Sequence, residues 1–236
     1  MDTIMEKRLS EANDLRESEH FSESLKSYTD CLIDLVNTKD FTGLIHCLGG
    51  QSLIYKNLLT RNNSPVYHHF VMSLAEETLE VAEANKDSLD ARTLSIAYSI
   101  YGDAMIDSGE ISEALSYFEK SFAVSTAGLP EKGRLKAHMG MLKYMLGDKK
   151  DGISTVESAL KDIRTGEMDT YAVRVWETGA LNGLAKIYAK EGDKAKALEI
   201  ADESLNIATS HNLSIRKREV EIIIDKINSG DSNFIL

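Results

Sequence analysis

The feature that most constrains this chain is a spacing of small residues that recurs four times in one register. Counted from Gly102, the positions seven, twelve, sixteen and nineteen residues later hold Gly109, Ala114, Phe118 and Ser121. The same offsets counted from Ala185 give Gly192, Ala197, Ala201 and Ser204; from Gly140 they give Gly147, Gly152, Val156 and Ala159; from Ala12 they give Glu19, Ser24, Tyr28 and Cys31. Recurrence over 20 to 50 residues predicts an array of repeated supersecondary units.

Each offset has a physical use in a pair of antiparallel helices. A small residue in each helix lets the two helices approach closely, and a glycine between them ends the first helix in a left-handed conformation. The larger residue four positions later fills the remaining gap. Apolar residues recur at intervals of three and four along almost the whole chain, and the alternation typical of strands is missing. These patterns predict an all-α chain built from helix pairs that stack on one another.

The residues of the repeat resemble the tetratricopeptide-repeat (TPR) family. Its pattern is W-x2-L-G-x2-Y, then A-x3-F, then P, over about 34 residues. The best matches here are Tyr98, Tyr101, Gly102, Ala114, Phe118 and Leu129-Pro130, followed by Leu184, Ala185, Tyr188, Gly192 and Ala197. The signature tryptophan is absent from every unit, and Pro130 is the one closing proline that survives. The resemblance covers about residues 5–210 and implies a right-handed α-solenoid.

The same register predicts the organisation of the chain. We expect one superhelical domain over residues 1–230, with five helix pairs and a C-terminal capping helix that covers the last pair. The expected units lie at about 5–38, 42–85, 95–128, 133–166 and 178–211, with the cap at 213–228 and a flexible tail at 231–236. The second unit is degenerate and opens at Leu48-Gly49. In the cap, five charged residues are expected to stay at the solvent-exposed surface: Arg216, Lys217, Arg218, Glu219 and Glu221.

Charge argues against two classes of partner. The chain has 236 residues and a net charge of −11. Residues 1–90 carry 8 basic and 16 acidic groups, residues 91–130 carry 2 and 5, and residues 131–236 carry 17 and 17. An acidic N-terminal half repels phosphate, so neither nucleic acid nor an anionic membrane is an expected partner. The N-terminus does not resemble a signal peptide, and two cysteines without CxxC spacing suit a reducing compartment, so we expect a cytoplasmic protein.

Catalytic and metal-binding motifs are missing from the sequence. There is no HExxH, G-x-S-x-G, phosphate-binding glycine loop or EF-hand loop, so we expect neither an enzyme nor a cofactor. Gly49-Gly50 lies in a helical register, where close helix contact explains it better than a nucleotide does. His46-Cys47 and His68-His69 are adjacent pairs, and adjacent helical residues point about 100° apart, whereas metal ligands on one helix need a spacing of three or four. Cys31 replaces a small packing residue and is expected to be a buried thiol.

The resemblance implies where a partner would bind. In TPR arrays the first helices of the pairs line a concave surface, which here would hold Asn13, His46, Ser99, Asp103, Ile106, Arg134, Met141, Met145, Asn182, Lys186 and Lys190. This surface would present acidic, apolar and basic stretches in turn. The alternative is that these residues are ordinary exposed side chains. The tail ends in Phe234-Ile235-Leu236, which is either disordered or docked in a groove of its own or a neighbouring chain.

The resemblance implies a non-enzymatic scaffold or adaptor that binds an unidentified protein or peptide. Two alternatives stay open. One is a peptide-sensing regulatory module, similar to bacterial pheromone receptors, that controls a separate output protein. The other is a self-assembling structural protein, because the exposed ends of repeat arrays can pair as homo-oligomers.

Overall fold

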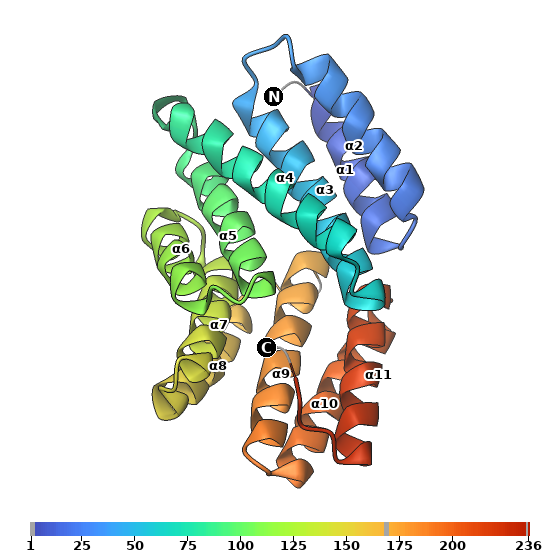
Figure 1. Ribbon diagram of the computed structural model, residues 1–236, viewed down its shortest axis with the longest axis vertical. Coiled ribbons are helices and arrows are strands. Elements are labelled where there is room, and N and C mark those ends of the chain that lie inside the picture. The colour runs from blue at the N-terminus through green and yellow to red at the C-terminus, as the bar shows by residue number, and fades with distance from the viewer. Residues whose placement is uncertain (1–2, 168–169, 235) are drawn as a thin grey trace. The chain divides into compact units, whose positions relative to one another are not determined.

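The computed structural model describes residues 3–167, 170–234 and 236 (Figure 1). This part of the chain forms eleven α-helices and one short 3-10 helix, and it contains no strand. The helices follow one another as antiparallel pairs with short connections. The prediction of an all-α helical repeat is therefore confirmed. Ile235 of the expected tail lies outside the described residues.

The chain divides into two compact units, Met1–Thr126 and Ala127–Leu236. Unit 1 holds three helix pairs: α1 (Thr3–Glu17) with α2 (Phe21–Leu35), α3 (Phe41–Asn62) with α4 (Pro65–Ala84), and α5 (Ala91–Asp107) with α6 (Ile111–Val124). The 3-10 helix η1 (Lys86–Ser88) joins α4 to α5. The degenerate second pair is the longest, with helices of 22 and 20 residues.

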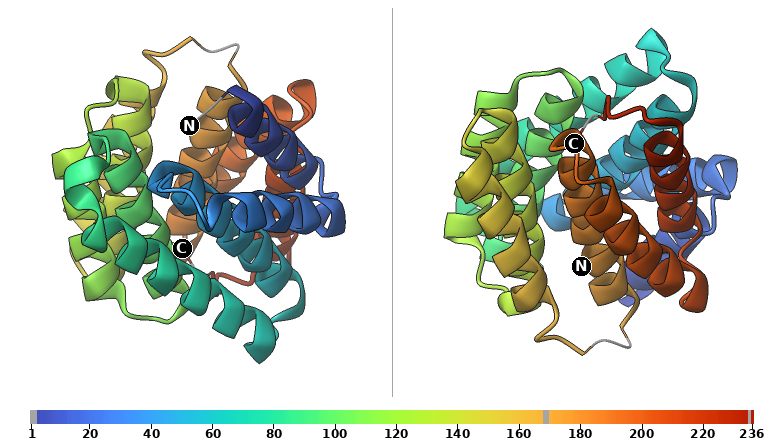
Figure 2. Two further views of the ribbon diagram at one scale, coloured as in Figure 1. Left: turned by 90° about the horizontal axis from the view of Figure 1, so that it is seen from above. Right: turned by 90° about the horizontal axis from the view of Figure 1, so that it is seen from below.

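Unit 2 holds two helix pairs and a further helix (Figure 2). These are α7 (Leu129–Met145) with α8 (Lys149–Ile163), α9 (Tyr171–Lys190) with α10 (Lys194–Ser210), and α11 (Ser214–Ser229). All the excess negative charge falls in unit 1, because residues 127–236 carry equal numbers of acidic and basic side chains. A single superhelical domain over residues 1–230 stays a prediction.

The turns within the pairs confirm the role expected of the spaced glycines. Gly109, Gly147 and Gly192 follow the first helices of their pairs with φ of +80°, +100° and +83°. In the first pair the equivalent position is Glu19, which takes the same left-handed conformation at φ +65°. Such backbone favours glycine because an L side chain is strained there.

The small residues of the register lie where the paired helices touch. A Cβ added to Gly140 of α7 would stand 2.8 Å from the main-chain nitrogen of Val156 and 2.9 Å from the main-chain oxygen of Gly152. In unit 1, a Cβ added to Gly102 would meet the Phe118 ring at 3.0 Å, and Phe118 itself is fully buried. Close approach of the backbones therefore sets the geometry of the α7–α8 pair, and the Phe118 ring fills the space beside Gly102 in the α5–α6 pair.

Close packing also explains Gly49-Gly50 on α3. A Cβ added to Gly49 would collide with the side chain of Ile100, and one added to Gly50 would collide with the Tyr28 ring. These contacts join α3 to α5 and to α2 within unit 1.

The last helix covers the end of unit 2. Val220, Ile223 and Ile227 are buried and form one cluster with Ala185 of α9 and with small residues of α10. This is the packing expected of a capping helix. None of the described helices combines the length and apolarity that crossing a membrane requires.

Candidate functional site

In both units the first helices of successive pairs pack on one another. In unit 1, α1 contacts α3 and α3 contacts α5; in unit 2, α7 contacts α9 and α9 contacts α11. Each unit therefore has a face formed by its first helices. The expected binding residues divide between the two faces, with Asn13, His46, Ser99, Asp103 and Ile106 in unit 1 and the rest in unit 2.

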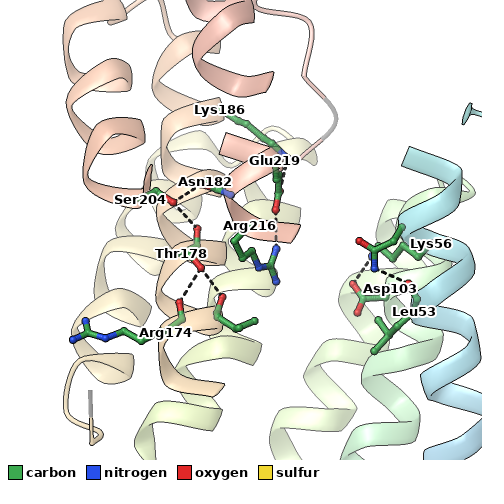
Figure 3. A network of polar contacts seen from close by, with 12 residues as sticks. Leu53, Lys56, Asp103, Arg174, Thr178, Asn182, Lys186, Ser204, Arg216 and Glu219 are labelled. Carbon is green, nitrogen blue, oxygen red and sulfur yellow. Dashed lines mark hydrogen bonds and ion pairs between the residues drawn. The ribbon is translucent and has the colours of Figure 1, made fainter. Parts of the chain in front are cut away.

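An ion-pair cluster lies between α3 and α5 of unit 1. The Lys56 ammonium nitrogen is 2.9 Å from Asp103 Oδ1 and 3.9 Å from Asp107 Oδ2 (Figure 3 shows the Lys56–Asp103 pair). Burial raises the pKa of Asp107, although Lys56 opposes the shift. The Lys56 cation thus lies within 4 Å of two carboxylates.

The other expected residues of unit 1 offer less surface. Ser99 is buried at 4% exposure, and its hydroxyl donates to the carbonyl oxygen of Ile96. His46 is half-buried, and burial lowers its pKa. Asn13 is exposed, but its amide oxygen accepts a 2.6 Å hydrogen bond from Tyr28. Ile106 is half-buried.

A second ion-pair cluster links α9 to α11 in unit 2 (Figure 3). Glu219 Oε1 is 3.4 Å from Lys186 Nζ, and Glu219 Oε2 accepts a 2.8 Å hydrogen bond from Arg216. Burial alone would raise the pKa of Glu219, but the cations Lys186 and Arg216 lower it to about 2. Of the five cap residues expected at the solvent-exposed surface, Lys217, Arg218 and Glu221 are exposed, but the expectation is wrong for Arg216 and Glu219. Both are half-buried, because α11 presents this side to α9.

Asn182 lies beneath this cluster and belongs to the core. It is 1% exposed, and its amide oxygen accepts a 2.6 Å hydrogen bond from the Ser204 hydroxyl (Figure 3). Thr178, one turn earlier, is also fully buried. The sequence placed Asn182 on the same helix face as Lys186, but the approach of α10 covers it.

The two methionines of α7 have different surroundings. Met141 packs on Gly183 of α9, where an added Cβ would collide with its sulfur. Met145 instead lines an open groove of about 520 Å³. Its walls are Tyr144, Met145, Gly147, Lys149, Lys190, Ser232, Phe234 and Leu236. Arg134, earlier on α7, is half-buried.

The C-terminal segment forms one wall of this groove. Phe234 is 7% exposed and packs against the cluster of Ala185, Val220, Ile223 and Ile227. The exposed Lys190 donates a 3.0 Å hydrogen bond to the Phe234 carbonyl oxygen. Met141, Met145, Lys186, Lys190 and Glu219 are called the α7–α9–α11 face below.

Neither metal binding nor thiol chemistry finds support in the described residues. Within them, no three His, Cys, Asp or Glu side chains lie together as metal ligands would. Cys31 and Cys47 are free and fully buried, and burial raises the pKa of Cys47 to about 12. A protonated thiol without solvent access is a poor nucleophile.

Sequence reasoning missed Lys56 and the orientation of Glu219. The spacing of Arg216 and Glu219, three residues apart, does show that they share one side of α11. Their partner Lys186 becomes visible only once α9 and α11 are packed together. Lys56 likewise lies on α3, 47 residues from Asp103.

Comparison with known proteins identifies the repeat. The family described as the SusR N-terminal TPR domain matches residues 52–222. No curated protein shows significant sequence similarity to the chain.

Solved TPR structures resemble the fold at low sequence identity. A Rap protein in complex with competence and sporulation factor matches with a TM-score of 0.68 and 16% identity, over 95% of this chain and 64% of that one. The chain thus spans slightly less than two thirds of that protein's length. The apo form of RapI matches with a TM-score of 0.60 and 15% identity, over 95% of this chain and 83% of that one.

A putative kinesin light chain of Podospora anserina has a TM-score of 0.54 and 12% identity, over 87% of this chain and 96% of that one. Likeness at this identity establishes a common fold. The family match covers well over half of the sequence and coincides with the repeat register described above. The chain therefore belongs to the SusR N-terminal TPR domain family.

Proposed function

We propose that this protein is a non-enzymatic binding module that holds a peptide segment of a partner on the α7–α9–α11 face. The observation that carries the proposal is that the Lys186 ammonium keeps hydrogen-bond donors beyond the one that Glu219 engages. This ammonium has three donors, and its 3.4 Å bond to Glu219 is long and engages one of them. Its side chain is 18% exposed, so the remaining donors lie in a partly desolvated setting where a hydrogen bond to a peptide is strong.

The surroundings of Lys186 suit a peptide. Met145 supplies a polarisable, adaptable apolar surface, and Lys190 supplies a second exposed cation. Unit 2 carries no net charge, so it does not repel acidic peptides as unit 1 does. The fold is shared with a Rap protein that was solved in complex with competence and sporulation factor, which is compatible with a binding role.

A peptide selection tests this function. Random twelve-residue peptides displayed on phage are selected on the immobilised protein, and the enriched peptides are titrated calorimetrically. Lys186→Gln removes one of the two cations of the face, whereas Lys161→Gln removes the same charge from an exposed position on the outer helix α8. We expect Lys186→Gln to weaken binding at least about fivefold, because a hydrogen bond from a charged group is lost, and Lys161→Gln to leave it unchanged.

Two results contradict the proposal: a selection without enriched peptides, or equal loss of affinity in both variants. Circular dichroism melts show whether each variant keeps its fold. A sedimentation series separates this function from self-assembly, which makes the protein's mass depend on concentration.

A further inference from the structure

The C-terminal residues already place an extended segment on the α7–α9–α11 face. They leave the end of α11 after Gly230, which has φ +79°, and run toward α9 (Figures 1 and 2). Phe234 is buried against α9 and α11, and Leu236 packs on the neighbouring cluster that contains α7 and α9 residues. The two side chains thus bridge two apolar clusters of unit 2.

Two of the hydrogen bonds that hold this segment use its main chain. Lys190 donates to the carbonyl oxygen of Phe234 at 3.0 Å, and Lys226 donates to the carbonyl oxygen of Asn233 at 3.0 Å. Every residue of a peptide carries such an oxygen, so these lysines would hold any extended segment. The side-chain requirement comes from the apolar contacts of Phe234 and Leu236.

Little else fixes the segment in place. The main-chain N–H groups of Asp231 and Phe234 donate to nearby main-chain carbonyl oxygens, those of Lys226 and Ser232 respectively. No main-chain to main-chain hydrogen bond joins the described residues 231–234 to α7, α8, α9 or α10. Asp231 adds an ion pair with Lys226 at 3.4 Å, where both side chains are over a third exposed. The groove of about 520 Å³ beside the segment leaves open space next to Phe234.

We propose that the segment carrying Phe234 and Leu236 is an intramolecular ligand of this face, which a partner displaces with an extended segment carrying an aromatic residue followed, two positions later, by an aliphatic one. This inference rests on the proposed function and names the chemistry of its peptide. The segment both occupies the site and shows what fits it. A partner segment takes the contacts of Phe234 and Leu236, and the two lysines hold its main chain.

Tethering makes the internal ligand a strong competitor. A short flexible linker holds its ligand at an effective concentration of about 1 mM. If the free segment binds with a dissociation constant of about 10–100 μM, the tethered copy occupies the site roughly 90–99% of the time. The apparent affinity for an external peptide then falls by about 10–100-fold.

The test uses a fluorescein-labelled peptide with the sequence of residues 231–236, titrated by fluorescence anisotropy. The protein is either the full wild-type chain or a Phe234→Ser/Leu236→Ser variant, whose own segment no longer competes. We expect the variant to bind the peptide at least tenfold more tightly than wild type. A control peptide with alanine at the positions of Phe234 and Leu236 should bind neither protein. Adding Met145→Glu to the variant should abolish binding, because the charge lies in the groove.

Equal affinity of wild type and variant overturns the inference, as does a folded variant that does not bind the peptide. The segment is then a permanent strap over α11. A wild-type protein that dimerises by exchanging its segment, seen by sedimentation, also overturns it, because the occupant is then a second copy.

Phe234 contributes to the core, so a melting curve must show that the variant folds. If the variant does not fold, amide hydrogen exchange of the wild type, with and without the peptide, tests the inference instead. Excess unlabelled peptide should accelerate exchange at residues 232–234, and unchanged exchange overturns the inference. If selected peptides lose affinity in Lys186→Gln yet bind wild type and the Phe234→Ser/Leu236→Ser variant equally well, that result refutes this inference alone and leaves the proposed function standing.

Discussion

Replacing Gly140 with alanine probes the close helix contact on which the repeat depends. The added Cβ would stand 2.6 Å from Val156 Cγ2, 2.8 Å from the Val156 nitrogen and 2.9 Å from the Gly152 oxygen. Two of these atoms belong to the backbone of α8, which cannot rotate away. The helices must separate by about half an ångström, and contacts weaken along the whole α7–α8 interface.

The expected cost follows from two opposing effects. Alanine favours the helix by about 1 kcal/mol over glycine. Overpacking of a rigid contact costs about 1–3 kcal/mol or more, and the backbone clash puts Gly140 at the upper end. The net loss should be about 2 kcal/mol, which lowers the melting temperature by roughly 4–8 °C in a chain of this length.

Gly179 of α9 provides the matched control. It is also helical, but the nearest atom to its added Cβ is the flexible Arg216 side chain at 3.5 Å, an ordinary contact. Gly179→Ala should therefore stabilise the protein by about 0.5–1 kcal/mol. Thermal and urea denaturation followed by circular dichroism measure both variants. A Gly140→Ala variant as stable as wild type, or more so, would refute the argument that backbone contact sets the pair geometry.

Two further predictions concern the half-buried carboxylate of Glu219 and the two buried thiols. The pKa of Glu219 is about 2 in the fold against an ordinary 4.5, so its ionisation stabilises the fold above about pH 4.5, and this is lost as the pH falls toward 2. Because the Glu219 side chain is 31% exposed, Glu219→Gln should lower the free energy of unfolding by about 1–2 kcal/mol at pH 7 and by nearly nothing at pH 2. Urea denaturation at the two pH values measures this, and an equal loss at both would contradict the lowered pKa of Glu219. Cys31 and Cys47 should react with a thiol reagent only as fast as the protein unfolds, because both are fully buried and burial raises both pKa values; rapid labelling of the native protein would be the contrary result.

The repeat could be predicted from sequence because its causes are local. Gly109 and Gly192 each end a helix within their own pair, and Ala114 and Phe118 meet their partners within the same 34-residue unit. The register is therefore visible as a spacing. Even Glu19, which breaks the glycine pattern, could be assigned its turn from the offset alone.

The candidate site could be predicted only in outline, because it depends on contacts between pairs. Lys186 and Met145 were placed on the first helices by register. The burial of Asn182 depends on Ser204 of α10, and the charge on Lys186 is balanced by Glu219 of α11. The amphipathic pattern of α11 made Glu219 resemble a surface residue, although its carboxylate lies against a neighbouring helix. The apolar tail Phe234-Ile235-Leu236 left docking open as one alternative, but the sequence did not show which surface Phe234 would contact.

Hydrogen exchange with a bound peptide tests the central claim most directly. A peptide enriched in the phage selection is added in excess to the full chain, and amide exchange is compared with that of the free protein. The account predicts slower exchange in α7, α9 and α11, whose side chains form the proposed face. Protection confined to α8 and α10, or to unit 1, would contradict it.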